Sequence, residues 1–65
     1  MRLRINGQDR TLPDGLTVAG MMEHLEIGQR VAVEINREII PHAAHAAHHL
    51  AEGDEVEIVH AIGGG

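Results

Sequence analysis

The chain has 65 residues, a formal charge of −5 at pH 7, and no cysteine, lysine or aromatic residue. One small domain is the most that this length allows. Without cysteine, neither a disulfide nor a thiolate zinc site can form. An acidic chain without aromatic rings is poorly suited to binding nucleic acid. No apolar run approaches the ~20 residues of a membrane helix, and Met1 leads into charged residues rather than a signal peptide, so we expect a cytoplasmic protein with no membrane partner.

The first segment predicts a β-hairpin. Residues 2–6 alternate polar and apolar side chains with a period of two, which is typical of a half-buried strand. Asn6-Gly7 follows, and it is a strong hairpin signal because both residues tolerate positive φ in a type I′ turn. Residues 8–12 then form the returning strand, which Pro13-Asp14-Gly15 ends in a turn.

A short helix follows the hairpin. Thr17 suits the N-cap, because its hydroxyl can accept a backbone N–H of the first turn. Apolar residues recur behind it at helical spacing, and Gly28 suits the left-handed region, so we expect a helix of about three turns that ends near Gly28. The residues of the apolar face are Val18, Met21, Met22 and Leu25.

The second half predicts three more strands. Residues 31–35 alternate again, Asn36-Arg37 forms a turn, and residues 38–40 form a short strand that Pro41 ends. Residues 42–50, rich in Ala and His, form an irregular or 3₁₀ connection. After a turn over 52–54, the last strand alternates Val56, Ile58, His60 and Ile62 on one face with Glu55, Glu57, Val59 and Ala61 on the other.

This order of elements predicts an α+β fold of the β-grasp, or ubiquitin-like, type. One main helix crossing a mixed sheet of four to five strands buries the apolar faces of both, and the last strand lies parallel to the first. We expect residues 1–62 to form this domain and residues 63–65 to form a flexible glycine tail. Arg2 and Arg4 then share the outer face of the sheet with glutamates of the last strand, Glu55 or Glu57, and such pairs of opposite charge stabilise a sheet.

The glycine tail carries the functional signal. Gly63-Gly64-Gly65 follows a hydrophobic strand without a spacer. Glycine is costly to order, but without a side chain it can pass through a narrow enzyme cleft and leave a terminal carboxyl open to attack. Adenylation with ATP would make that carboxylate reactive toward a sulfur nucleophile. The plain alternative is a frayed chain end.

With these features the sequence resembles the ThiS family of sulfur carriers in thiamine biosynthesis. The resemblance covers nearly the whole chain and depends on the order and spacing of several motifs that are weak one by one. They are Asn6-Gly7, Gly15-Leu16-Thr17-Val18, Leu25, Val31-Ala32-Val33-Glu34-Ile35-Asn36, Ile40-Pro41, Glu52-Gly53-Asp54-Glu55-Val56-Glu57-Ile58 and Ala61-Ile62-Gly63-Gly64-Gly65.

The resemblance implies a carrier protein, not an enzyme. An E1-like adenylating enzyme of the ThiF type would adenylate the Gly65 carboxylate with ATP, and sulfur from a cysteine persulfide would convert it to a thiocarboxylate. The thiocarboxylate would donate its sulfur to a thiazole synthase of the ThiG type, which builds the thiazole ring of thiamine. Gly65 is then the covalent attachment point, Gly64 and Gly63 thread through the enzyme, and the chain itself binds no cofactor.

The sheet surface beside the tail is the expected docking surface for a partner. Val59 and Ala61 fall on the outer face of the last strand, and together with Ile62 they place apolar side chains next to the tail. The acidic residues within 52–57 would complement a basic groove on the activating enzyme and speed association.

The histidines offer a competing interpretation. On a helix, His42, His45 and His49 would lie near one face and suit Zn or Ni, with His48 beside them. We favour solvated surface residues, because such spacing alone is a weak metal signal, and we expect no metal site. His60 belongs either to the partly buried face or to the end of the sheet, and a structural role is favoured over a ligand role.

Other functions stay open at this point. A carrier of the same fold could serve molybdopterin or cysteine synthesis, and a ubiquitin-like modifier would join Gly65 to a lysine of its target. A plain interaction or metal-binding module would leave the tail inert. The absence of lysine favours a carrier over a modifier, because one copy of this chain has no lysine to which the Gly65 of another copy could be joined.

Overall fold

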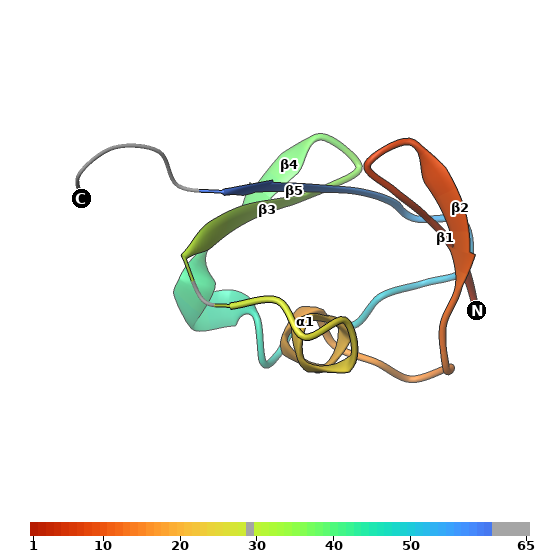
Figure 1. The fold of residues 1–65 in the computed structure, drawn as a ribbon. Helices are drawn as coiled ribbons and strands as arrows, with labels where there is room; N and C mark the ends of the chain where they lie inside the picture. Colours follow the sequence, from red (N-terminus) through yellow and green to blue (C-terminus); the bar gives the residue numbers. More distant parts are fainter. Residues whose placement is uncertain (29, 61–65) are drawn as a thin grey trace.

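A computed structural model describes residues 1–28 and 30–60 of the chain. In this part, five strands form one mixed sheet and a single α-helix crosses one of its faces (Figure 1). The strands are β1 (Arg2–Ile5), β2 (Gln8–Thr11), β3 (Val31–Ile35), β4 (Glu38–Ile40) and β5 (Glu55–His60), in the spatial order β2-β1-β5-β3-β4. The predicted β-grasp architecture is confirmed, with the larger of the two expected numbers of strands.

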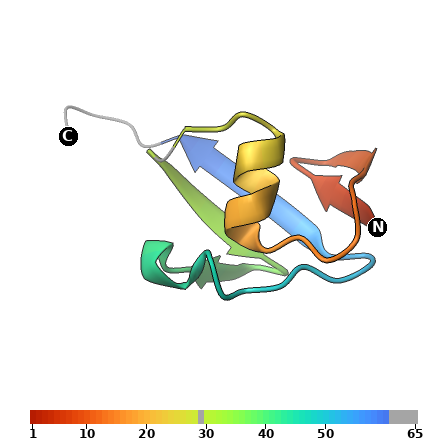
Figure 2. The ribbon, with the colours of Figure 1, turned by 90° about the horizontal axis from the view of Figure 1, so that it is seen from below.

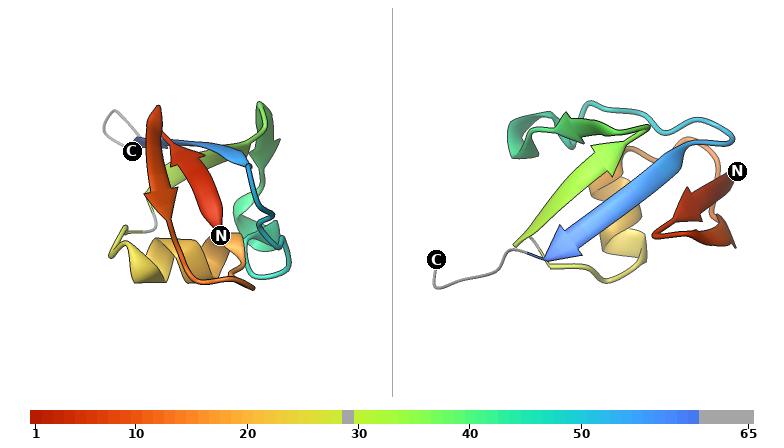
Figure 3. Two further views of the ribbon diagram at one scale, coloured as in Figure 1. Left: turned by 90° about the vertical axis from the view of Figure 1, so that its right-hand side faces the viewer. Right: turned by 90° about the horizontal axis from the view of Figure 1, so that it is seen from above.

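The strand β5 is the middle strand and joins two hairpins into one sheet. It pairs in parallel with β1, where Arg4 lies opposite Glu55, and antiparallel with β3, where Ala32 lies opposite Val59. The outer strands β2 and β4 are the antiparallel partners of β1 and β3. Figure 3 shows β5 running between β3 and the first hairpin, so the last strand does lie beside the first, as predicted.

Both hairpin turns have positive φ at their two central residues. The angles are 50° at Asn6 and 81° at Gly7 in the first turn, and 51° at Asn36 and 71° at Arg37 in the second. Two such residues are typical of a type I′ turn, whose twist matches that of the flanking strands. At the second central position the first turn has Gly7, whereas the second turn has Arg37. Because arginine has a Cβ atom, its left-handed conformation costs about 1–2 kcal/mol of conformational energy.

The helix α1 (Val18–His24) begins where the sequence predicts. Thr17 is its N-cap, and the Thr17 Oγ1 atom accepts the backbone N–H of Gly20 at 3.1 Å. Figure 2 shows α1 lying across the strands of the sheet. Within the part of the chain that the structure describes, no helix combines the length and the apolar character needed to cross a membrane.

The predicted end of the helix near Gly28 is wrong, because α1 has only seven residues. Glu26 adopts a left-handed conformation with φ of 57°. Its N–H donates to the carbonyl of Glu23, and the N–H of Ile27 donates to the carbonyl of Met22. These two hydrogen bonds form a Schellman motif, which ends a helix at the residue with positive φ. Glycine usually occupies that position, so the glutamate gave no sequence signal for it.

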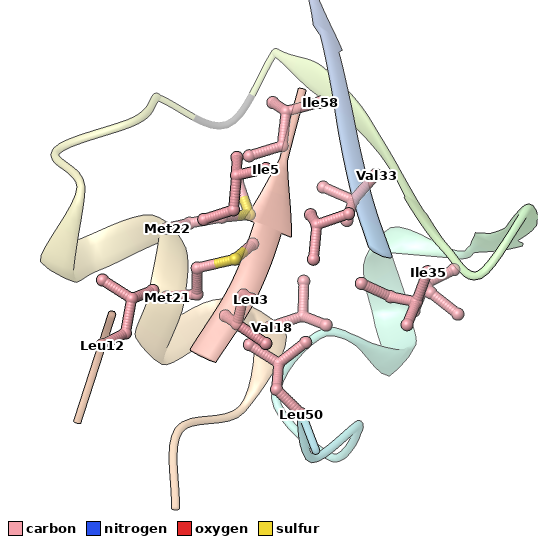
Figure 4. Close-up of a cluster of buried hydrophobic side chains, with 12 residues drawn as sticks. Leu3, Ile5, Leu12, Val18, Met21, Met22, Val33, Ile35, Leu50 and Ile58 are labelled. Carbon is pink, nitrogen blue, oxygen red and sulfur yellow. The ribbon is translucent and has the colours of Figure 1, made fainter. Parts of the chain in front are cut away.

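The hydrophobic core lies between α1 and the inner face of the sheet (Figure 4). Alternate strand residues point toward the helix, in agreement with the predicted period of two. The buried apolar residues are Leu3, Ile5, Leu12, Val18, Met21, Met22, Val33, Ile35, Ile40, Leu50, Val56 and Ile58. A chain of 65 residues has only a small core, so the loss of one of these side chains has a large effect on stability.

The segment between β4 and β5 begins with a 3₁₀ helix, η1 (His42–Ala44), as predicted. Further on it is tied to the start of α1, because the N–H of Val18 donates to the carbonyl of His48 and the N–H of Leu50 donates to the carbonyl of Leu16. Residues 61 and 62, predicted to continue the last strand, lie outside the described residues. The division into residues 1–62 and 63–65 therefore stays a prediction.

Candidate functional site

The candidate site is the outer face of the sheet, which α1 leaves uncovered, together with the end of β5 (Figure 1). In the part of the chain that is described, Val59 and Ile39 are the large apolar side chains with high exposure, at 51% and 67%. Ala32 is the exposed neighbour of Val59 on β3. We call Ala32, Ile39 and Val59 the outer apolar residues. They lie on three adjacent strands and contribute little to folding, because their surface stays in water.

Acidic side chains adjoin the outer apolar residues. Glu57 of β5 lies opposite Glu34 of β3, and Glu34 lies opposite Ile39 of β4. Like charges that face each other across a strand pair lower the stability of a sheet. This arrangement is therefore unfavourable in the isolated chain, and a basic surface placed on it would relieve the repulsion.

Arg2 and Arg4 of the first hairpin share this face, as predicted. Arg2 and Arg4 alternate with the buried residues Leu3 and Ile5 of β1, and Arg4 lies opposite Glu55. Among the described residues, however, neither arginine has a carboxylate within ion-pairing distance, and the one ion pair found there joins the Met1 amino group to Asp14. The guanidinium groups and the glutamates of β5 are thus left available to other groups.

Two asparagine side chains hold β5 from opposite ends. The Oδ1 atom of Asn6 accepts the N–H of Ile58 at 2.8 Å, and its Nδ2 atom donates to the carbonyl of Ile58 at 3.2 Å. The Oδ1 atom of Asn36 accepts the N–H of Glu55 at 3.0 Å, and its Nδ2 atom donates to a carboxylate oxygen of Asp54 at 3.0 Å. In the sequence both asparagines are turn signals only, and nothing there predicts these contacts. An asparagine at the first position of both turns was the available hint.

The expectation that the clustered histidines are all surface residues is wrong for His45. This side chain is only 5% exposed, and its Nε2 atom lies 3.0 Å from the carbonyl oxygen of Ile40. The 3₁₀ helix after Pro41 turns the chain so that the His45 ring faces inward. The other members are less enclosed: His42 and His49 are exposed, and His48 is half-buried.

The histidines are not assembled into a metal centre in the part of the chain that is described. No group of three or more His, Cys, Asp or Glu side chains there is placed to hold one ion. The rings of His42 and His45 lie 5.0 Å apart, beside Glu23 and Met22, in a groove of about 250 Å³ between α1 and η1. His60 is exposed at the end of β5, so the second of the two predicted positions, at the sheet end, is the correct one.

The sequence-predicted site is thus described only in part. Val59 lies exposed on the outer face, as the alternation predicts. The other two docking candidates, Ala61 and Ile62, lie outside the described residues, and so do Gly63, Gly64 and Gly65. The strand that leads toward them is described as far as His60, five residues before Gly65.

Comparisons with known proteins agree with this fold and topology. The model of the ThiS family matches residues 3–65. The crystal structure of the thiamine biosynthesis protein ThiS from Geobacter metallireducens has a TM-score of 0.88 and 33% sequence identity, and the match covers 100% of both chains. A thiazole synthase from Paramagnetospirillum magneticum is 42% identical over 66 residues, and another from Magnetococcus marinus is 35% identical. The chain spans 20% of the length of each of these two enzymes and is matched over 100% of its own length.

The mixed sheet, the single crossing helix and the inserted last strand define a ubiquitin-like β-grasp protein. Because the family model matches residues 3–65, nearly the whole chain, the chain belongs to the ThiS family.

Proposed function

We propose that this chain is a sulfur carrier of thiamine biosynthesis and that the carboxylate of Gly65 is its reactive group. The observation that carries the proposal is the family match, which extends from the first strand through the final glycines. A solved relative of the same length and fold is a thiamine biosynthesis protein, which supports the same role. The carrier needs no catalytic side chain of its own, because a partner enzyme performs the chemistry.

The proposed chemistry takes place at one carbon atom. A Gly65 carboxylate oxygen attacks the α-phosphate of ATP on an E1-like enzyme of the ThiF type, which forms an acyl-adenylate and releases pyrophosphate. The terminal sulfur of a cysteine persulfide then attacks the acyl carbon and AMP leaves. A second thiol cleaves the S–S bond of the product, which leaves a thiocarboxylate on Gly65 and a disulfide on the donor. Gly64 and Gly63 provide a segment without side chains that fits a narrow active site.

The outer face of the sheet is the proposed docking surface for the adenylating enzyme. The outer apolar residues supply an area that gains from removal of water, and Glu34 and Glu57 favour a partner with basic residues around an apolar centre. Val59 is only six residues from Gly65 in the sequence, so a partner that binds at Val59 is also within reach of the tail. Ala61 and Ile62 remain proposed members of this surface.

A thiazole synthase of the ThiG type is the proposed acceptor of the sulfur. Two thiazole synthases contain a region that matches the full length of this chain within one much longer polypeptide. A carrier and an enzyme joined in one chain meet at high effective concentration, which suits two proteins that act in sequence. This likeness supports thiamine synthesis over molybdopterin or cysteine synthesis as the destination of the sulfur.

Intact-mass spectrometry tests the proposal. The protein isolated from its native cells should end at Gly65 and include a form whose mass corresponds to exchange of one oxygen for one sulfur. Incubation with ATP and a ThiF-type enzyme should form the acyl-adenylate on the wild-type chain. A variant that lacks Gly65, or that carries one residue beyond it, should form none.

Three other outcomes would contradict the proposal in different ways. A covalent ladder of larger proteins joined through Gly65 would identify a modifier. A thiocarboxylate form that transfers sulfur to molybdopterin or cysteine synthesis, and not to thiazole, would retain the carrier and overturn the destination. A chain that is never adenylated would be an interaction module with an inert tail.

A further inference from the structure

The pairing between β1 and β5 extends past the last residue of β1. The N–H of Arg4 donates to the carbonyl of Asp54 at 3.0 Å, and the N–H of Asn6 donates to the carbonyl of Val56 at 2.9 Å. At Asn6 the backbone turns away into the hairpin, with φ of 50°. The next residue of β5 that would pair on this side is Ile58, and the backbone of β1 no longer reaches it.

The side chain of Asn6 takes the place of that missing peptide group. A side-chain amide carries the same donor and the same acceptor as a peptide. Its Oδ1 atom accepts the N–H of Ile58 at 2.8 Å, and its Nδ2 atom donates to the carbonyl of Ile58 at 3.2 Å. The parallel pairing is thereby lengthened by two hydrogen bonds without any further residue of β1.

Asn6 provides the last contact of this kind before β5 ends. Beyond Ile58, Val59 and His60 have their register partners, Ala32 and Val31, on β3 only. Without the Asn6 amide, the final three residues of β5 would be paired on one side alone. The end of the strand could then bend about β3, and the direction in which the backbone leaves β5 at His60 would no longer be held.

We propose that Asn6 is a positioning residue that holds the end of β5 in the direction in which the adenylating enzyme receives the segment leading to Gly65. This inference rests on the proposed carrier function. The acyl carbon must arrive within bonding distance of the ATP α-phosphate, and a misplacement of about 1 Å can lower a rate by ~100-fold. Asn6 acts through β5 and touches no reacting atom.

Asn36 offers a matched control within the same molecule. It occupies the same position of a type I′ turn, with φ of 51°, and it also binds the β5 backbone through its Oδ1 atom. Its contacts are to Glu55, the first residue of β5, and to Asp54 just before it, at the opposite end of the strand from His60. The two asparagines therefore make similar contacts, but only those of Asn6 lie near the end of β5.

The experiment compares Asn6→Gly with Asn36→Gly in the full chain. Glycine adopts the positive φ of both turns, so each substitution removes the amide and keeps the turn. We expect Asn6→Gly to speed hydrogen exchange of the Ile58 amide and Asn36→Gly to speed that of the Glu55 amide. In adenylation by a ThiF-type enzyme, Asn6→Gly should lower kcat by about tenfold and leave KM within about twofold, because Val59 stays paired with β3. Asn36→Gly should leave both constants within about twofold of wild type.

A second variant, Asn6→Asp, separates the two hydrogen bonds. Aspartate tolerates positive φ and still accepts the N–H of Ile58, but its carboxylate cannot donate to the Ile58 carbonyl. Its kcat should also fall below that of wild type, because a carboxylate oxygen then faces the Ile58 carbonyl oxygen where the amide donated. This variant also provides the test if Asn6→Gly is unfolded.

Equal effects of Asn6→Gly and Asn36→Gly on kcat would overturn the inference, because a loss of general stability would then explain both. An unchanged kcat in both Asn6 variants, with an active wild type, would overturn the inference alone. A wild-type chain that is not adenylated would instead overturn the proposed function, so the two failures are distinguishable.

Discussion

The two faces of the sheet use the same kinds of residue for different purposes. On β5, Ile58 and Val59 are adjacent in sequence, yet Ile58 is 9% exposed against the helix and Val59 is 51% exposed on the opposite face. An apolar side chain on the inner face stabilises the fold, since it is removed from water when the chain folds. An apolar side chain on the outer face gains that stabilisation only when a partner covers it. The inner face therefore determines whether the chain folds, and we propose that the outer face determines which partner it meets.

The largest expected effect comes from a charge on the inner face. Val56 of β5 is fully buried, so Val56→Asp places a carboxylate without a partner inside the core. Burial of such a group lowers the free energy of unfolding by several kcal/mol, which is about as much as the ~3–5 kcal/mol that the core of so small a domain contributes. Far-UV circular dichroism should show an unfolded chain. A folded Val56→Asp variant with a normal melting temperature would contradict the burial of this position.

The second-largest expected effect on stability comes from creating a cavity on the helix side of the same core. Met21 of α1 is fully buried, and Met21→Ala should lower the free energy of unfolding by about 2–5 kcal/mol. Urea denaturation followed by circular dichroism measures the change. The control is Glu23→Ala, which alters an exposed residue of the same helix and should stay within about 0.5 kcal/mol of wild type. Equal losses in the two variants would show that the burial of Met21 does not determine the effect, because alanine is the best helix former and costs no helix propensity at either position.

A charge on the outer face should change partner binding and leave the fold intact. Val59→Asp should lower the free energy of unfolding by no more than about 1 kcal/mol, the range of strand propensities, and raise KM for adenylation by about tenfold. The control is Thr11→Asp, which puts the same charge on an exposed residue of β2, two strands away from β5. If both variants raise KM equally, the added charge and not the position of Val59 is responsible. If neither raises it, the docking surface lies elsewhere.

The smallest expected effect concerns the two glutamates that face each other on the outer side. Glu34→Gln removes the repulsion with Glu57, so it should raise the free energy of unfolding by about 0.2–1 kcal/mol. The gain should shrink in high salt, which screens exposed charges. Urea denaturation at low and high ionic strength measures both effects. A comparison with Glu38→Gln, an exposed residue of β4, shows whether any loss of negative charge has the same result.

The sequence predicted the strands, the helix start and the outward position of Val59, because each depends on residues that are close together in the chain. Period-two alternation predicts the strands, and Thr17 predicts the N-cap. The failures have a different origin. Glu26 ends the helix with a positive φ that glutamate rarely adopts, and His45 is buried because the 3₁₀ turn aims its ring at the carbonyl of Ile40. Neither feature follows from the identity of one residue.

The sequence by itself determined the fold class, the family and the glycine ending that we propose as the reactive end, since local patterning and the order of motifs are written in the chain. Only the tertiary structure decided what Asn6 does. Its partner, Ile58, is 52 residues away, and the two meet only because β5 is inserted beside β1. The same insertion leaves Val59 exposed beside Ala32 and sets Glu57 opposite Glu34. Such pairings depend on the register between distant strands, which no single segment of the sequence specifies.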